Sequence, residues 1–147
     1  MREGVEINIC KSLESMKTFY KLNCITRKRH GLPPQPYYFF KNIYDFIISR
    51  DLGIVVLASY KKRAIAGAVF FHFGEKVIIK YSGSDIAYQH LRPNNLVMWE
   101  GIKLYCKNGY KTFCLGRTEL ENEGLRRYKE GWGTEEIIIK NLLFLLR

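Results

Sequence analysis

The first part of the chain changes from a two-residue to a three- or four-residue hydrophobic repeat. Apolar and polar residues alternate from Val5 to Cys10, as they do in a half-buried strand. From Leu13 to Cys24 the apolar positions recur every three or four residues, which predicts a helix that Ser12 caps and Gly31 ends. Pro36 suits the first turn of a second helix whose apolar face repeats with the same spacing.

The middle of the chain has the pattern of three consecutive strands. Apolar and β-branched residues dominate residues 54–57, 64–73 and 76–81. The connections at 61–63 and 74–75 are short enough to be hairpin turns. The sequence therefore predicts an antiparallel meander.

The last third returns to alternating helices and strands. Residues 93–107 predict a third helix, residues 112–115 a short strand and residues 121–129 a fourth helix. We expect one or two closing strands within residues 136–146. The resulting order is strand, helix, helix, three strands, helix, strand, helix and closing strands.

Composition indicates one domain with an attraction to anions. The 147 residues are 47% hydrophobic, enough to bury about two-thirds of the unfolded surface around one core. The formal net charge of +10 favours a nucleotide, a coenzyme phosphate, RNA or an anionic lipid surface as partner. Charge does not choose among them, and a surface that is merely well solvated stays an alternative.

Cysteine and histidine spacing predicts neither a metal site nor a disulfide framework. No Cys-x-x-Cys pair occurs, and the histidines are scattered; the residues are Cys10, Cys24, Cys106, Cys114, His30, His72 and His90. We interpret His72, inside an apolar strand, as a hydrogen-bonded core residue. No apolar run approaches the roughly 20 residues that span a bilayer, so we expect a cytoplasmic protein, or one peripheral to the inner membrane face.

Three stretches resemble the FemAB-like subgroup of the GNAT (N-acetyltransferase) superfamily. They are Arg29 to Pro36, Ser82 to Asp85, and Leu115 to Thr118 together with Asn122 to Gly133. The resemblance implies an α/β (α+β) fold with a mixed, mostly antiparallel sheet of about six or seven strands flanked by four helices. It also implies that the sheet splays between its fourth and fifth strands, with the acyl donor in the gap.

The resemblance implies an N-acyltransferase or aminoacyltransferase that serves the cell envelope, peptidoglycan bridges or polysaccharides. The acceptor amine would then be muropeptide-like. Members commonly carry two such domains in tandem, and residues 1–147 match the C-terminal one as a single domain. We therefore expect a chain that either forms a homodimer or works with a missing N-terminal domain.

Donor binding is expected at the ends of the splayed strands and at the start of the third helix. Unpaired backbone groups near Ser82, Gly83, Ser84 and Leu115 could bind the donor and its reacting carbonyl. Phosphates would lie at the helix start, on Arg92, Asn94 and Asn95. Arg92 and Asn94 stand where the family has glycines, and Pro93 removes an amide donor. The donor therefore stays open between acyl-CoA and aminoacyl-tRNA, and a plain helix start is the alternative.

Acceptor binding and proton transfer are expected in the last third of the chain. We expect the acceptor to bind at Arg117, Thr118, Asn122 and Lys129. Arg117 follows the short strand at the mouth of the expected gap, and its guanidinium suits a carboxylate or phosphate, whereas an ion pair with a nearby glutamate is its alternative role. The resemblance implies the acceptor role of Lys129. Tyr128 could be the general acid that protonates the leaving group, although related proteins have Phe at this position. Asp85 is a candidate general base near the gap, or else a turn residue.

Two other functions stay open. The basic runs Arg27 to Arg29, Lys61 to Arg63 and Arg126 to Arg127 could belong to a nucleic-acid-binding module. No helix-turn-helix, zinc-finger or RNA-binding sheet motif accompanies them, which favours transfer chemistry. The chain could also be the non-catalytic, structural half of a two-domain transferase.

Overall fold

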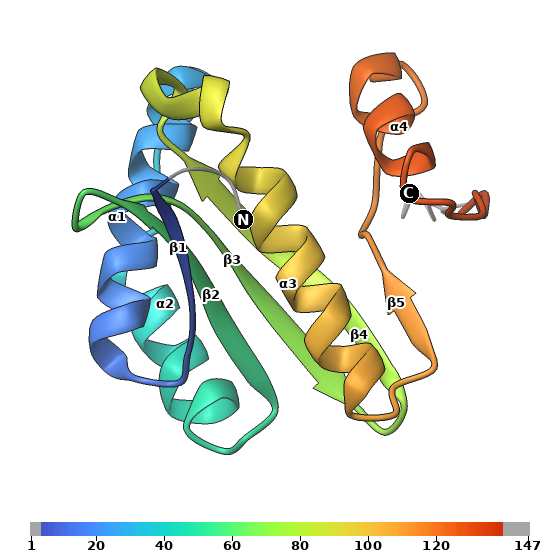
Figure 1. The fold of residues 1–147 in the computed structure, drawn as a ribbon, viewed down its shortest axis with the longest axis horizontal. Helices are drawn as coiled ribbons and strands as arrows, with labels where there is room; N and C mark the ends of the chain where they lie inside the picture. Colours follow the sequence, from blue (N-terminus) through green and yellow to red (C-terminus); the bar gives the residue numbers. More distant parts are fainter. Residues whose placement is uncertain (1–3, 140–147) are drawn as a thin grey trace, which may run out of the picture. The chain divides into compact units, whose positions relative to one another are not determined.

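A computed structural model describes residues 4–139 of the chain and divides it into two compact units. The larger unit ends at Gly116, and the smaller begins at Arg117. The larger unit contains a five-stranded sheet in the order β1-β2-β3-β4-β5 (Figure 1). The strands are β1 (Val5–Cys10), β2 (Gly53–Tyr60), β3 (Arg63–Phe73), β4 (Lys76–Ser84) and β5 (Thr112–Cys114).

The first four strands form an antiparallel meander, as the hydrophobic pattern predicts. Lys61 and Lys62 alone connect β2 to β3, and both have positive φ, 48° and 64°. Two consecutive left-handed residues make the tight turn whose twist matches that of paired strands. Gly74, with φ 60°, starts the equally short connection from β3 to β4.

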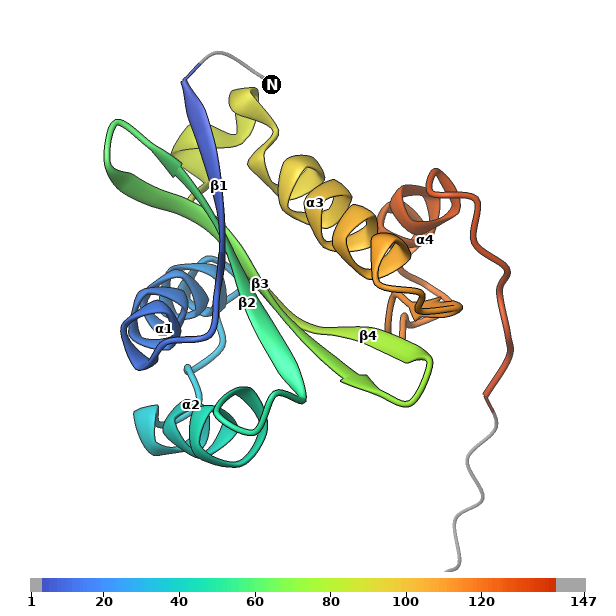
Figure 2. The same cartoon turned by 60° about the horizontal axis from the view of Figure 1, so that its bottom comes forward.

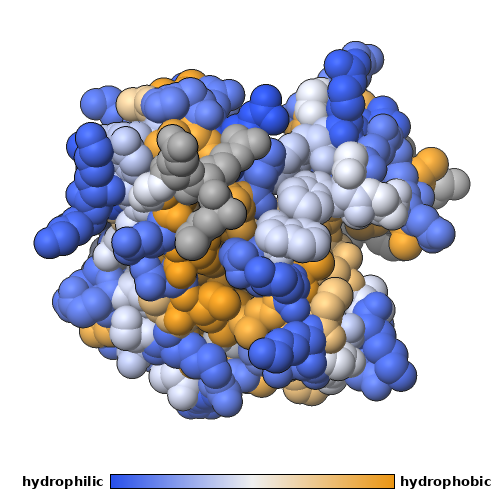
Figure 3. Space-filling view, viewed as in Figure 1, coloured by the Kyte–Doolittle hydropathy of each residue, from blue (hydrophilic) through white to orange (hydrophobic). Residues whose placement is uncertain are grey.

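Two helical layers cover the two faces of the sheet (Figure 2). The helices α1 (Leu13–Arg29) and α2 (Tyr37–Ile43) lie on one face, and α3 (Pro93–Lys107) lies on the other. A π-helical segment, η1 (Tyr44–Ile48), continues α2, and a 3-10 segment, η2 (Ile86–Leu91), precedes α3. In the face shown in Figure 3, apolar residues gather over the sheet beside α3 and hydrophilic residues surround them.

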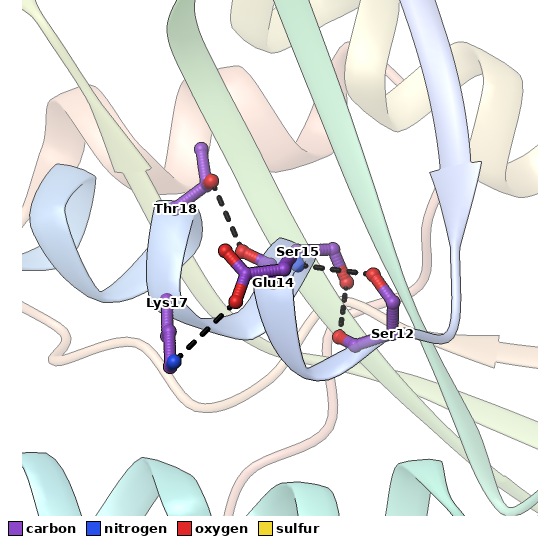
Figure 4. A network of polar contacts seen from close by, with 5 residues as sticks. All are labelled: Ser12, Glu14, Ser15, Lys17 and Thr18. Carbon is purple, nitrogen blue, oxygen red and sulfur yellow. Dashed lines mark hydrogen bonds and ion pairs between the residues drawn. The ribbon is translucent and has the colours of Figure 1, made fainter.

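Local polar contacts fix the start of α1 where the sequence predicts it. Ser12 accepts a hydrogen bond from the Ser15 N–H at 3.1 Å, and the Ser15 hydroxyl donates to the Ser12 carbonyl at 2.6 Å (Figure 4). Glu14 in the first turn also pairs with Lys17 at 3.3 Å. The apolar face behind this cap buries Met16 and Phe19 completely.

A bulge in β4 reverses the faces of its side chains. Val69 and Phe70 of β3 pair with Tyr81 and Ile79, so Lys80 is an extra residue in β4. Ile79 packs into the core under α3, whereas Tyr81, two residues further on, packs into the core under α1 and α2. Regular alternation would place both on one face, so the bulge changes the frame of the strand.

The bulge coincides with the place where β5 leaves β4. The two strands are parallel and paired only through Lys76–Thr112, Val77–Phe113 and Ile78–Cys114. An extra residue bends and twists its strand, so β4 turns away from β5 just beyond Ile78. Figure 1 shows the two strands diverging from their paired ends. The expected splay between the fourth and fifth strands is therefore confirmed.

The smaller unit contains α4 (Glu123–Glu130), close to the helix predicted for residues 121–129. Of the predicted closing strands, residues 136–139 are not in a strand, and residues 140–146 lie outside the described residues. The sheet in residues 4–139 therefore has five strands rather than six or seven. The run of three β-branched isoleucines at 137–139 favoured a strand there, but these side chains are exposed. The predicted α+β fold class is confirmed.

Candidate functional site

Contacts with α1 hold the end of β4 in place. The Ser84 N–H donates to the Thr26 hydroxyl at 2.9 Å, and the Ser84 carbonyl accepts from that hydroxyl at 3.3 Å. Arg29 donates to the same carbonyl at 3.0 Å. A serine near the end of a strand thus has both backbone groups satisfied by a helix rather than by another strand. The last turn of α1 becomes part of the region where β4 ends.

The contacts of Ser84 reveal which backbone groups of β4 face its open edge. In an antiparallel strand, the N–H and C=O of one residue point to the same side, and the sides alternate along the chain. Those of Ser84 point to α1 residues, and the next N–H, of Asp85, donates to Ile65 of β3 at 2.9 Å. The backbone groups of Ser82 therefore point away from β3 as well. Among the described residues, no strand pairs with this side of Ser82.

The predicted donor residues of β4 lie on different faces of the strand. Ser82 is exposed, and the Ser84 hydroxyl accepts a hydrogen bond from the Asn94 side chain of α3 at 3.3 Å. Gly83 is buried against α1, where an added Cβ would lie 2.9 Å from the carbonyl carbon of Leu22. Only a glycine lets β4 and α1 approach so closely. Ser84 and Asn94, which the sequence assigned to one site, are thus in contact.

The backbone just before α3 has a conformation typical of glycine, although the residue there is Arg92. Arg92, the residue before Pro93, has φ 49° and ψ 50°, a left-handed conformation that glycine adopts most easily. It is exposed, and its side chain does not cap the helix. The N–H groups in the first turn of a helix lack partners within the helix, so those of Asn94 and Asn95 suit an anion. Arg92 therefore preserves the local backbone shape where the sequence departs from the family pattern.

Asp85 is engaged in structural contacts. One carboxylate oxygen accepts from the Ala87 N–H at 3.1 Å and caps η2, and the other pairs with Arg63 at 3.2 Å. The Arg63 guanidinium also lies 5.7 Å from the centre of the Tyr88 ring. These contacts match the turn role that the sequence left as the alternative. They join the β2–β3 turn to the end of β4.

Leu115 follows directly after β5, and its side chain is half-buried. The next residue, Gly116, has φ 82°, and an added Cβ there would lie 3.6 Å from the Ile79 carbonyl oxygen. The chain thus stays near β4 for a short distance beyond the last paired residue, Cys114. Leu115 lies beside the point at which the two strands separate.

Three of the four expected acceptor residues, Arg117, Thr118 and Lys129, contact one another in the smaller unit. Lys129 of α4 donates to the Thr118 hydroxyl at 2.5 Å and to the Arg117 carbonyl at 3.3 Å. Asn122 caps α4 by accepting from the Leu125 N–H at 3.1 Å. Arg117 and Glu119 form an exposed ion pair at 3.7 Å, which is the alternative role expected for Arg117.

Tyr128, the candidate general acid, lies on α4 beside Trp132. Their rings meet edge to face, with centroids 6.3 Å apart. Burial raises the pKa of the Tyr128 hydroxyl, and a hydrogen bond with Trp132 opposes part of that increase. The hydroxyl therefore keeps its proton at neutral pH, as a general acid must before it reacts.

His72 is hydrogen-bonded, as predicted, but it is half-buried at the edge of the core rather than inside it. One ring nitrogen lies 2.7 Å from the carbonyl oxygen of Asp51, and the other lies 2.8 Å from the Tyr105 hydroxyl. Because a carbonyl only accepts, Nε2 donates to the Asp51 carbonyl, and in a neutral imidazole Nδ1 then accepts from the Tyr105 hydroxyl. Burial raises the pKa of the Tyr105 hydroxyl, and Tyr110 adds to the increase.

Sequence reasoning missed Thr26 and Arg29 as parts of this region. Arg29 was noted within a basic run and at the start of a stretch that resembles the family, without a role in the site, and Thr26 lies 58 residues from the serine that it contacts. Nothing in their local pattern indicates that α1 ends beside β4. Only the pairing of the whole sheet brings them there.

Two further observations concern metals and membranes. In residues 4–139, no three His, Cys, Asp or Glu side chains gather in a group that could hold a metal ion. The four cysteines are free thiols. None of the helices in the described part of the chain has the length and apolarity to cross a bilayer.

Solved structures share this fold. FemX superposes with a TM-score of 0.81 at 17% identity, over 91% of this chain and 51% of FemX. This chain thus spans about half the length of FemX. The ribosomal-protein-S18-alanine N-acetyltransferase from Escherichia coli has a TM-score of 0.75 at 12% identity, covering 91% of this chain and 79% of that one. Aminoglycoside N-acetyltransferase AAC(6')-Iy, solved with CoA, gives 0.71 at 12%, covering 97% and 94%.

Sequence comparison identifies the family. No curated protein matches the chain. Residues 2–130 match the family described as the acetyltransferase (GNAT) domain, which covers most of the sequence. Two structural features agree with this match: β4 and β5 separate beyond Ile78, and the residue before α3 has a left-handed backbone. The chain belongs to the GNAT acetyltransferase family.

Proposed function

We propose that this chain moves an acyl group from an activated donor to an amine, with the donor lying along the open edge of β4. The observation that carries the proposal is the separation of β4 from β5 beyond Ile78. It exposes the backbone N–H and C=O of Ser82 in the middle of the sheet, where a polar group of the donor can pair with them. Fixed backbone dipoles of this kind bind a carbonyl without having to reorganise.

The start of α3 would hold the donor phosphates. The N–H groups of Asn94 and Asn95 and the positive end of the helix favour a diphosphate, and the exposed Arg92 adds a charge. Pro93 supplies no N–H, so the site has one backbone donor fewer than a glycine there would give. An acyl-CoA fits this arrangement, and AAC(6')-Iy, of the same fold, was solved with CoA. An aminoacyl-tRNA is the alternative donor.

The chemical step would be direct attack of the acceptor amine on the donor carbonyl. The new C–N bond forms as the bond from the carbonyl carbon to the leaving group breaks, and the amine gives up one proton to solvent water. For a thioester donor, the leaving thiolate takes a proton, which we assign to the Tyr128 hydroxyl, and the Tyr128 phenolate then regains a proton from solvent. Arg117, Thr118, Asn122 and Lys129 would bind the acceptor. Both Asp85 oxygens already have partners, so we assign Asp85 to positioning.

The likeness to FemX favours a more specific role. We propose that the acceptor is a muropeptide-like amine of the cell envelope and that the chain matches one half of a tandem two-domain protein. FemX is about twice as long, which supports that arrangement. A second domain, or a second copy of the chain, would then complete the acceptor side.

A pair of Ser82 variants tests the donor site. Ser82→Pro removes the outward N–H without touching the bonds to β3, because proline is tolerated where a strand N–H faces an open edge. We expect unchanged thermal stability and an affinity for the donor about 10-fold lower, the loss of about one hydrogen bond. Ser82→Ala keeps the N–H and serves as the control. Equal affinities for the two variants would contradict the assigned edge.

Isothermal titration calorimetry shows which compound is the acyl donor and whether Arg117 binds the acceptor. The titrations use acetyl-CoA, longer acyl-CoA thioesters, an aminoacyl-tRNA and nucleotide-linked muropeptides. Arg117→Ala should weaken muropeptide binding and leave donor binding unchanged. An unchanged muropeptide affinity would remove Arg117 from the acceptor site, and binding of none of these compounds would contradict the proposed function.

A further inference from the structure

Three segments far apart in the sequence meet at one end of the larger unit, and together they are strongly basic. They are the end of α1, the β2–β3 turn and the start of α3 with η2. Contacts at Ser84 and Asp85 join these segments. Arg29 of α1 donates to the Ser84 carbonyl, and Asn94 of α3 donates to the Ser84 hydroxyl. Arg63, which follows the β2–β3 turn, pairs with the Asp85 carboxylate. Figure 1 shows the end of α1 beside η2.

This surface, here called the basic end, carries far more positive than negative charge. Residues 24–36, 57–66 and 84–98 contain one carboxylate, Asp85, and seven cationic side chains. The cations are Arg27, Lys28, Arg29, Lys61, Lys62, Arg63 and Arg92. Asp85 is already paired with Arg63. Six of the seven cations lie on α1 and at the β2–β3 turn rather than at the start of α3, so a phosphate site at that helix start does not account for them.

Exposed aliphatic side chains lie among these charges. Ile86, directly after Asp85, is 57% exposed, and Leu32, after the end of α1, is 49% exposed. Ile25 is 39% exposed and shares one face of α1 with Lys28 and Arg29, three and four residues later. Cations around exposed aliphatic groups are typical of surfaces that enter the headgroup region of a bilayer.

The aromatic rings at the basic end argue against a polynucleotide. Proteins that bind single-stranded RNA stack bases on free aromatic faces. Here Arg63 lies over the Tyr88 ring at 5.7 Å, and Lys61 lies over the Tyr60 ring at 5.3 Å. The two rings also contact each other, with centroids 6.1 Å apart. These rings are occupied within the protein, whereas the exposed side chains are aliphatic.

We propose that the basic end docks on an anionic lipid bilayer, with Ile86 and Leu32 entering the headgroup region. The five cations outside the donor site and the Asp85 ion pair would bind lipid phosphates; they are Arg27, Lys28, Arg29, Lys61 and Lys62. The proposal does not depend on acyl transfer. Docking would be peripheral, through charge and a small apolar area, and therefore reversible and sensitive to salt.

Vesicle co-sedimentation of the full chain tests the proposal. Phosphatidylcholine vesicles are compared with vesicles that also contain phosphatidylglycerol, at low and at high salt. The patch variant is Lys61→Asn with Lys62→Asn, because asparagine tolerates the positive φ of this turn and removes only charge. The control variant, Lys76→Gln with Lys107→Gln, makes the same charge change where β4 begins and α3 ends.

We expect the chain to bind the anionic vesicles and not the neutral ones. The patch variant should bind them about 30-fold more weakly, because each lysine near such a surface contributes about 1 kcal/mol. The control variant should bind like the unmodified chain. Ile86→Ser with Leu32→Ser should lower the affinity about 10-fold, and added salt should not remove this difference.

Three results would overturn the proposal. Equal binding to neutral and anionic vesicles would remove the charge argument. Equal losses in the patch and control variants would show that net charge alone, rather than this surface, attracts the lipid. Single-stranded RNA that binds through Lys61 and Lys62, while vesicles do not bind, would assign the basic end to a polynucleotide. Circular dichroism confirms that each variant is folded.

Discussion

Replacing Gly83 with alanine tests the close contact between β4 and α1. An ideal Cβ at this position would lie 2.9 Å from the Leu22 carbonyl carbon and 3.0 Å from both the Asn23 nitrogen and the Leu22 oxygen. All three are backbone atoms, so no side-chain rotation relieves the overlap. The helix has to move as a whole by a few tenths of an ångström, and it carries the fully buried Met16 and Phe19 with it.

The cost follows from other overpacked cores. Extra carbon atoms forced into a well-packed interior cost about 1–3 kcal/mol of unfolding free energy. For a unit of this size, we expect the Tm of Gly83→Ala to fall by about 4–12 °C. Because α1 carries Thr26 and Arg29, the same movement should weaken their contacts with Ser84 and lower the affinity for the acyl donor.

Gly124→Ala provides a matched control. Apart from its two chain neighbours and the backbone of its own helix, no described atom lies within 4 Å of an ideal Cβ at Gly124, which is in α4. Alanine is better than glycine in a helix by up to about 1 kcal/mol, so this variant should keep or slightly raise its Tm. Thermal unfolding followed by circular dichroism measures both variants. A Gly83→Ala protein with the Tm of the unmodified chain would refute the close packing of α1 on β4.

Three further predictions concern single side chains. Thr26→Val should lower the unfolding free energy by about 1–3 kcal/mol in denaturant titrations, since it leaves the Ser84 N–H unpaired; an unchanged midpoint would contradict that contact. Burial raises the pKa of Tyr105 in the folded protein, so stability should fall as pH rises above the ordinary tyrosine value of about 10. Tyr105→Phe should flatten this alkaline decline while losing the bond to His72, and an equally steep decline would assign it to other tyrosines. Tyr128→Phe should lower kcat about 100-fold or more with little change in KM if Tyr128 is the general acid, whereas an unchanged kcat would exclude that role.

Local patterns predicted most of the elements of the larger unit. The bounds of α3 were predicted at both ends because Pro93 begins the helix and Asn108-Gly109 follow it. The meander was predicted because its turns are short and its strands are rich in β-branched residues. Both signals involve neighbours in the sequence, so a single sequence contains them.

Features that depend on distant contacts were not predictable. The bulge at Lys80 arises from the pairing of β4 with β3, and nothing in Lys80 itself marks it. The left-handed conformation of Arg92 is unexpected for a residue with a Cβ, so sequence reasoning counted this position as a loss of the family pattern. The Thr26–Ser84 contact spans 58 residues. The isoleucines at 137–139 suggested a strand, because composition does not distinguish exposed from buried β-branched residues.

The extra residue in β4 makes this part of the chain more sensitive to length than to residue type. Lys80 is exposed, so many side chains could replace it. Deleting it would make Ile79 and Tyr81 direct neighbours, opposite Phe70 and Val69 as they are now. Tyr81 and Gly83 would keep the faces that they have, because consecutive residues of a regular strand alternate. What would be lost is the bulge and the bend that it causes, so a shortened β4 would continue alongside β5 and close the edge at Ser82.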